Sequence, residues 1–274
     1  MPRIPRPLLP AALVLATGIG MASATGAETL CTLVMDAQSA AILFEQGDCD
    51  TRVTPASTFK IPLAVMGYDA GILEDAHAPL HSYRPGEPDW GGDNWTRDTD
   101  PTDWLTYSVV WYSQRITAAL GQHRLTGYAV AFDYGNADFS GDAGFDNGLE
   151  RAWIASSLKV SPLEQASFLR ALLRDTLPVT PRAMAQTRAI VEQRTVEGWT
   201  LHGKTGGAYP RRADRSFDYA RGWGWYVGWA ELGKRRLIFV RLTQDDRRQK
   251  LSPGIRARDA FIGKWPDLAR SLQP

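Results

Sequence analysis

Strand patterns lie at both ends of this chain and helical patterns fill its middle, and this order limits the fold more than any other feature. The segment "TLVMDAQSAAILFEQGD" (32–48) indicates two strands around a turn at 37–39. After residue 190, "WTLHGKTG", "GWGWYVGWAEL" and "RRLIFVRLT" predict further strands, and a last helix is expected over 255–272. This order predicts an α/β lobe built from 25–70 and 190–274, with a helical lobe over 71–189 inserted between them. A cleft between two such lobes is a usual place for a small-molecule site.

The middle of the chain carries the helical periodicity. Helices are expected over 57–68, 104–120 and 125–132. The stretch "SPLEQASFLRALLRD" contains its own start signal, with Ser161 as N-cap, Pro162 in the first turn and Glu164 completing a capping box. Residues 75–101 are rich in Pro, Gly, Asp and Trp and are expected to form a long ordered loop.

The first 24 residues differ in composition from the rest. Arg3 and Arg6 precede an apolar run that ends in "ASA" (22–24), a pattern typical of a secretory signal peptide. A retained membrane anchor is the alternative, but the run is short and interrupted by proline. We therefore expect a signal peptide over 1–24, export to the periplasm, and a single two-lobed catalytic domain over 25–274 that is free of the membrane after cleavage.

The charge and the metal-ligating residues exclude several partner classes. Lysine plus arginine number 31 and aspartate plus glutamate 30, which gives a formal net charge of +1. Such a balance offers no electrostatic basis for binding nucleic acid or a membrane surface. Two cysteines and four scattered histidines lack the spacing of a zinc site, so no metal is expected. The oligomeric state is not indicated.

Both cysteines, Cys31 and Cys49, lie close to the expected start of the mature protein. A disulfide is the natural state of two such cysteines in an oxidising compartment. The strand–turn–strand pattern between them would bring them to the same end of a hairpin. The alternative is a pair of buried free thiols.

Two serine–lysine pairs have the same spacing, Ser57–Lys60 in "PASTFKIP" and Ser156–Lys159 in "SSLK". Residues three apart on a helix share a face, so the amine of Lys60 would lie beside the hydroxyl of Ser57. Apolar neighbours would desolvate Lys60 and keep it neutral, as a base that activates serine must be. The second pair precedes the capped helix in an expected connector. We therefore predict that Ser57 is the nucleophile and Ser156 is inert.

Three further short motifs accompany the first pair in a fixed order: "SVVW" (108–111), "YGN" (134–136) and "KTGG" (204–207). Other serine chemistries find no support, because the chain has no G-x-S-x-G elbow, no H-E-x-x-H and no histidine in a triad context.

In these motifs the chain resembles the class D, oxacillinase-type serine β-lactamases. The resemblance runs through "PASTFKIPLAVMGYDAGIL", "DWLTYSVVWYSQRITAALG", "FDYGN", "LHGKTG", "GWYVGW" and "PGIRARD", and so covers essentially all of the mature chain. It implies the fold of the penicillin-recognising serine enzymes, an antiparallel sheet with flanking helices and an inserted helical lobe. It also implies hydrolysis of β-lactam antibiotics, and hence antibiotic resistance.

The resemblance assigns roles to individual residues. Ser57 would be acylated, and Lys60 would carry CO2 as N6-carboxylysine and act as general base, with no other cofactor. Ser108 would relay a proton to the ring nitrogen, and Trp153 would hold the carbamate. The remaining assignments concern substrate binding and the pocket. Lys204 and Thr205 would contact the carboxylate side of the substrate, and Arg256, with Arg258 as its alternative, would bind the carboxylate itself. The backbone N–H groups of Ser57 and Gly207 would form the oxyanion hole, Val110 would keep the base pocket dry, and Tyr134 and Asn136 would shape the cleft wall.

One departure from the family pattern concerns substrate range. Members usually have K-T-G-x-G, whereas this chain has Gly207 followed by Ala208. The sequence does not indicate whether oxacillin, cephalosporins or carbapenems are hydrolysed. Two alternatives share the serine–lysine pair: a β-lactam sensor domain that is acylated without turnover, and a cell-wall D,D-peptidase. Turnover of a β-lactam distinguishes both from a β-lactamase.

Overall fold

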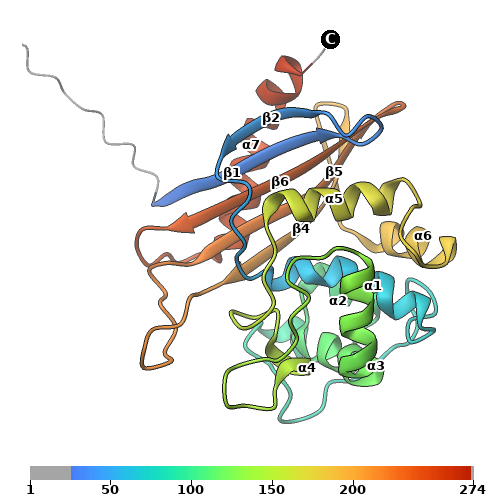
Figure 1. Cartoon of the computed structure of the whole chain (residues 1–274), viewed down its shortest axis with the longest axis vertical. Coiled ribbons are helices and arrows are strands. Elements are labelled where there is room, and N and C mark those ends of the chain that lie inside the picture. The colour runs from blue at the N-terminus through green and yellow to red at the C-terminus, as the bar shows by residue number, and fades with distance from the viewer. Residues whose placement is uncertain (1–25, 273–274) are drawn as a thin grey trace, which may run out of the picture.

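A computed structural model describes residues 26–272 and places a six-stranded antiparallel sheet along one side of the molecule (Figure 1). The strand order is β2-β1-β6-β5-β4-β3. The strands are β1 (Ala27–Asp36), β2 (Ile42–Gly47), β3 (Gln193–Val196), β4 (Trp199–Ala208), β5 (Trp223–Leu232) and β6 (Arg235–Asp245). The two ends of the chain therefore join in one sheet where β1 pairs with β6, as the sequence predicts.

The helices between the two strand groups gather below one face of the sheet (Figure 1). They are α1 (Lys60–Asp69), α2 (Pro101–Tyr107), α3 (Val110–Ala131), α4 (Gly148–Arg151), α5 (Pro162–Leu173) and α6 (Pro181–Ile190), with short 3-10 turns at η1 (Ala56–Phe59) and η2 (Asp93–Trp95). The predicted capping box is present at α5, where the Ser161 side chain accepts from the backbone N–H of Glu164 and the Glu164 side chain accepts from that of Ser161. The prediction of one continuous helix over Trp104–Leu120 is wrong, because the helix is interrupted at Ser108, between α2 and α3.

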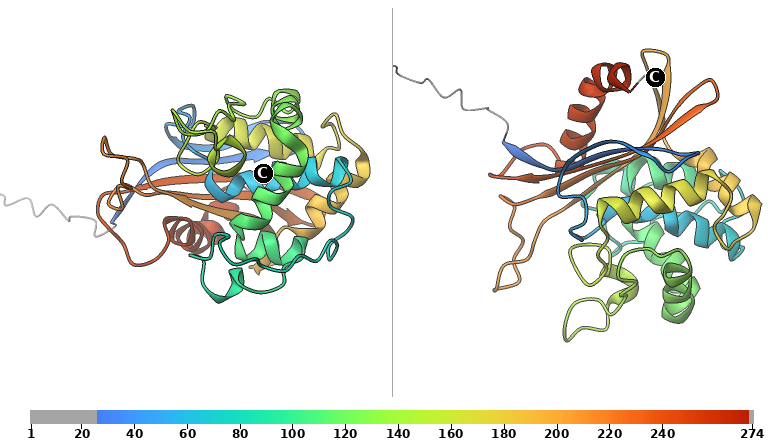
Figure 2. Two further views of the ribbon diagram at one scale, coloured as in Figure 1. Left: turned by 90° about the horizontal axis from the view of Figure 1, so that it is seen from below. Right: turned by 45° about the horizontal axis from the view of Figure 1, so that its top comes forward.

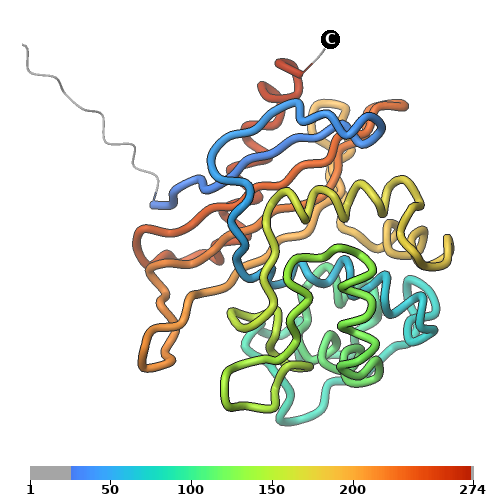
Figure 3. Tube along the Cα trace, viewed as in Figure 1, coloured from blue at the N-terminus to red at the C-terminus, as the bar shows by residue number. Residues whose placement is uncertain are grey.

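One hydrophobic core spans the sheet and the helices. It joins Leu33, Val227 and Val240 of the strands to residues of α1, α3 and α5. The helix α5, placed by the sequence in the inserted lobe, packs directly against β6 and β1, and the tube of Figure 3 shows it lying along the sheet. The residue limits of the two lobes stay a prediction.

The opposite face of the sheet is covered by α7 (Pro253–Ser271), so that the sheet lies between α7 and the other helices (Figure 2). A second apolar cluster fills this interface, with Tyr226 and Phe239 of the sheet against Phe261 and Trp265 of α7. Because α7 begins beside β4 and β5, its first turn reaches the same edge of the sheet as the candidate site.

The N-terminal hairpin is closed by the predicted disulfide. β1 pairs with β2 through a turn after Asp36, and Cys49, two residues beyond β2, is bonded to Cys31 in β1 with a Cα–Cα distance of 5.1 Å. The predicted signal peptide (1–24) lies outside the described residues. Over 26–272 no helix is long and apolar enough to cross a membrane.

Removing this disulfide should cost stability without altering the site. For a sequence separation of 18 residues, the loop-closure entropy that the bond removes from the unfolded chain is worth about 3 kcal/mol. We expect Cys31→Ala/Cys49→Ala to lower the free energy of unfolding by about this amount in urea titrations. An unchanged unfolding midpoint in the double variant would show that the bond does not form in the oxidised protein.

Candidate active site

The Ser57 turn connects the sheet to α1. Ala56 has a left-handed backbone conformation (φ 51°), and Ser57 follows it in the 3-10 turn η1. Thr58 fixes the turn from below, since its hydroxyl donates to the Pro55 carbonyl at 2.7 Å and accepts from the Gln165 amide at 3.0 Å. These bonds hold the serine at the wall of the cleft.

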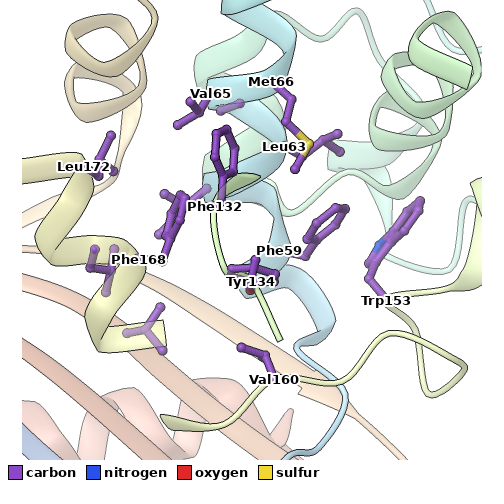
Figure 4. Close-up of a cluster of buried hydrophobic side chains, with 14 of the residues drawn as sticks. Phe59, Leu63, Val65, Met66, Phe132, Tyr134, Trp153, Val160, Phe168 and Leu172 are labelled. Carbon is purple, nitrogen blue, oxygen red and sulfur yellow. The ribbon is translucent and has the colours of Figure 1, made fainter. Parts of the chain in front are cut away.

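Phe59 anchors the same turn in the core. Its ring lies 5.9 Å from Tyr134, 5.7 Å from Phe139 and 5.6 Å from Trp153, with the Trp153 ring stacked on it (Figure 4). Aromatic contacts of this kind immobilise the residue between the two candidate catalytic groups. Position 59 thus fixes where Ser57 and Lys60 point.

Lys60 begins α1 and is fully buried, and its amine has no hydrogen-bond partner among residues 26–272. Burial lowers the pKa of Lys60 well below that of an ordinary lysine, and the nearby charge of Lys204 lowers it further. Because desolvation disfavours the charged form, the amine can be neutral near neutral pH. A neutral amine one turn from a serine is able to accept a proton.

Ser108 lies at the break between α2 and α3, with a left-handed conformation (φ 60°). The indole N–H of Trp95 donates to the Tyr107 carbonyl at 2.8 Å, and the indole N–H of Trp104 donates to Ser113 at 2.9 Å, so both sides of the break are held. The break turns the Ser108 side chain into the cleft, which Val110 also lines.

Lys204 approaches the cleft from β4. Its ammonium group donates to the Ser108 hydroxyl at 2.5 Å, although 96 residues separate the two in sequence. Burial is the main cause that lowers the pKa of Lys204, to about 8, with Glu192 opposing the shift and Arg258 adding to it. Thr205 follows and lines the cleft itself.

Two glycines of β4 allow close approaches that build the site. A Cβ on Gly206 would lie 2.8 Å from the Pro55 carbonyl oxygen, so glycine is required where the Ser57 turn meets the strand. A Cβ on Gly207 would lie 2.9 Å from the Ser252 hydroxyl. A side chain at 207 would therefore crowd the residue that precedes α7.

The structure separates the two arginines considered for the substrate carboxylate. Arg256 points away from the cleft and binds the buried carboxylate of Asp245 with both oxygens, at 2.5 and 2.6 Å. Arg258, two positions on, lines the cleft with Ser252 and Ile255, at spacings that keep the three on one helix face. The placement of Arg256 in the cleft is thus wrong, because the helical phase turns it to the other side.

Two other residues expected in the wall are also outside it. Tyr134 is buried and donates to Gln165 at 3.2 Å, so it supports the Ser57 turn from the core. Asn136 binds the backbone of 157–159. In that connector Ser156 donates to Asp142 at 2.7 Å and Lys159 is exposed, which leaves the second serine–lysine pair without a shared pocket.

The cleft has a volume of about 570 Å³. It brings together Ser57, Ser108, Val110, Thr205, Gly207 and Arg258, with Lys60, Lys204 and Trp153 buried around it. Sequence reasoning missed several wall residues: Trp90, Trp95, Tyr107, Ile154, Glu192, Tyr209, Ser252 and Ile255. The tryptophans of the 75–101 loop were the one available signal. Among residues 26–272 no cluster of metal-ligating side chains is found.

Comparison with known proteins first defines the class. A family model of the penicillin-binding protein transpeptidase domain matches residues 30–261. Beta-lactamase OXA-9 of Klebsiella pneumoniae is 40% identical, covering 88% of this chain and 89% of that protein. Beta-lactamase OXA-1 of Escherichia coli is 35% identical, covering 85% and 82%.

Solved structures agree with the sequence relatives. The class D β-lactamase OXA-427 superimposes with a TM-score of 0.82 at 43% identity, covering 89% of this chain and 99% of that one. The chain belongs to the class D β-lactamases. The family and the transpeptidase-like fold expected from the motifs are confirmed.

Proposed function

We propose that the protein hydrolyses β-lactams through an acyl-enzyme on Ser57. The observation that carries the proposal is the convergence of three chain segments on one cleft. Ser57 has the buried Lys60 behind it, whose amine has no hydrogen-bond partner within residues 26–272, and the Lys204–Ser108 pair faces it. A serine activated by a neutral base is a nucleophile suited to acyl transfer.

Acylation requires one proton to leave Ser57 and one to reach the ring nitrogen. The Ser57 oxygen attacks the β-lactam carbonyl carbon as its proton passes to the base at position 60. The backbone N–H groups of Ser57 and Gly207 would stabilise the oxyanion that forms. When the carbon–nitrogen bond breaks, Ser108 gives its proton to the nitrogen. Lys204, which donates to Ser108, can restore that proton.

The pocket of Lys60 suits a reversible carbamate. Only a neutral amine adds CO2, and burial lowers the pKa of Lys60 and so favours the neutral form. The carbamate would supply a carboxylate base close to the positive charge of Lys204. Trp153, stacked on Phe59, and the hydroxyls of Ser57 and Ser108 are the groups able to hold it, and Val110 limits access of water.

The carboxylate of the substrate would bind on the β4–α7 side of the cleft. Lys204 and Thr205 supply donors from the strand, and Arg258 supplies a guanidinium from α7. Arg256 is already neutralised by Asp245. Because Gly207 has no side chain and Ser252 lies beside it, the substrate range should depend on residues of α7 as well as on those of β4.

We further propose that residues 1–24 direct export to the periplasm. The sensor and D,D-peptidase alternatives are distinguished by the fate of the acyl-enzyme. Steady-state hydrolysis of a penicillin panel should continue for many turnovers per Ser57. A single stoichiometric burst with no subsequent turnover would instead support a sensor.

Acylation should be confined to Ser57. Ser57 lines the cleft, whereas Ser156 is hydrogen-bonded to Asp142 beside an exposed lysine. Intact-mass analysis and peptide mapping after reaction with a slowly hydrolysed β-lactam should find one adduct, on the peptide containing Ser57. Ser57→Ala should remove it and Ser156→Ala should leave it. An adduct on the 156–159 peptide would overturn the assignment.

The alkaline limb of the pH profile should belong to Lys204. Its pKa is lowered to about 8 by burial, so its charge is lost above this pH, earlier than in an exposed lysine. Because kcat/KM reports the free enzyme, it should decline as pH rises through about 8. In Lys204→Arg the limb should move to higher pH, since a guanidinium keeps its charge. If kcat/KM of Lys204→Arg declined at the same pH as that of the wild type, the group that titrates there would not be Lys204.

A further inference from the structure

A buried arginine lies on the face of the sheet that α7 covers, away from the catalytic cleft. Arg241 is on β6 and only 6% exposed. Two cavities of about 440 Å³ each open between the sheet and α7, and Arg241 and Lys264 line both of them. The pair is therefore common to both cavities, which we refer to together as the groove.

The hydrogen bonds of Arg241 leave it incompletely satisfied. Its two terminal nitrogens donate to the hydroxyls of Thr32 and Thr29, each at 3.0 Å. A β-bulge in β1 between Thr29 and Cys31 shifts the register so that both threonines reach the same guanidinium. The Nε–H is buried and has no partner among the described residues. Neutral hydroxyls accept hydrogen bonds but do not balance the charge.

No carboxylate of residues 26–272 forms an ion pair with Arg241. The acidic residue that lines the groove, Asp267, is already paired with Arg270. Arg256, which also lines it, is paired with Asp245. Lys264 adds a second positive charge at the mouth. Burial lowers the pKa of Arg241, yet a guanidinium remains charged in proteins. An unpaired buried charge is costly, and its usual compensation is an anion.

We propose that the groove between Arg241 and Lys264 binds a small tetrahedral oxoanion, phosphate or sulfate. A guanidinium presents planar paired donors that match such an anion, and the ammonium of Lys264 closes the site from α7. The threonines orient the guanidinium and leave its remaining N–H groups for the ligand. The site is separate from the Ser57 cleft, so the proposal does not depend on catalysis.

The test uses the whole mature protein and inorganic phosphate, sulfate and chloride at matched ionic strength. Isothermal titration should find one phosphate or sulfate site with a Kd on the order of 1 mM, an affinity reachable by two charged groups. At a hundredfold excess over Kd the melting temperature should rise in a saturable way by about 5 °C. Chloride should give no saturable rise.

Variants separate a specific site from the general effect of salts, which stabilise proteins by exclusion. Arg241→Met should lose both the saturable binding heat and the saturable increase in melting temperature. Lys264→Gln should weaken binding roughly threefold. Lys234→Gln removes the same charge at the exposed β5–β6 turn and should bind like wild type. Absence of saturable binding to wild type, equal binding by Lys264→Gln, or equal saturation by chloride would overturn the proposal.

Discussion

Lys60→Met should abolish turnover and, in CO2-depleted buffer, make the folded protein more stable. The amine is fully buried without a hydrogen-bond partner in the described structure. Methionine has a similar volume and no polar group, so the substitution removes an unsatisfied buried group at a gain of about 1 to 3 kcal/mol. Loss of the base should reduce kcat/KM by about 10³-fold or more. Opposite changes in activity and stability are expected where a strained functional group has been retained.

The pH dependence of this gain follows from the lowered pKa. The folded state releases the Lys60 proton at lower pH than the unfolded chain, which titrates near 10.4. Below the folded pKa both states are charged and burial of the charge is costly. Between the two values the unfolded state binds more protons, so wild-type stability rises with pH. In CO2-depleted buffer the advantage of Lys60→Met should therefore shrink as pH increases.

The matched control is Lys159→Met, which changes the lysine of the other serine–lysine pair. Lys159 is exposed, so its replacement should alter neither turnover nor the urea midpoint. Urea denaturation at several pH values and steady-state hydrolysis of a penicillin measure both effects. A Lys60→Met protein that is less stable than wild type at every pH would show that the amine is satisfied in solution.

Much of the site was predictable because its residues are fixed by local chemistry. Ser57 and Lys60 share a helical start, and their apolar neighbours made a position beside a cleft predictable. The capped helix after Ser156 and Lys159 likewise made their position in a connector predictable; the catalytic roles stay a prediction. The sheet was predictable from both ends of the chain, since the strands of "GWGWYVGWAEL" and "RRLIFVRLT" are long and apolar. In the structure they are β5 and β6.

The errors arose where tertiary geometry sets direction. Arg256 and Arg258 differ by two positions, and only the starting point of α7 decides which one faces the cleft. The left-handed Ser108 interrupts a helical pattern that continues through it in the sequence. Tyr134 supports the Ser57 turn through Gln165, a partner 31 residues away, and no local pattern reports such a contact. Spacing predicts faces within an element, but it does not predict how elements meet.

Gly207 illustrates the same limit in a different way. In the sequence it is a missing side chain in the cleft wall. In the structure the space beside it is occupied by Ser252, which would lie 2.9 Å from an added Cβ. A side chain at 207 would therefore meet a residue that lies 45 positions later in the chain. Gly207 and Ser252 come together because α7 approaches β4, and the sequence pattern alone does not reveal this approach.

Turnover should depend on dissolved CO2, and the dependence should require the indole N–H of Trp153. After acid treatment and degassing, wild-type hydrolysis of a penicillin should fall at least about tenfold and recover with bicarbonate, as expected when a general base is removed and restored. Activity should also fall at acidic pH, because a protonated Lys60 cannot add CO2. Trp153 is buried against Phe59, so Trp153→Ala should stall at deacylation but also leave a cavity.

Trp153→Phe separates the two effects of that substitution. Phenylalanine keeps an aromatic ring against Phe59 but removes the N–H, so folding should persist while deacylation slows by about 10²-fold, the cost of losing one donor to an anion. Intact-mass analysis during turnover should then find the acyl-enzyme on Ser57 accumulating in both Trp153 variants and not in wild type. Wild-type turnover that ignores bicarbonate after acid decarboxylation would exclude the carbamate and leave the unmodified amine of Lys60 as the base. If turnover of Trp153→Phe depended on bicarbonate as that of the wild type does, the carbamate proposal would stand, and the hydroxyls of Ser57 and Ser108 would be the groups that stabilise the carbamate.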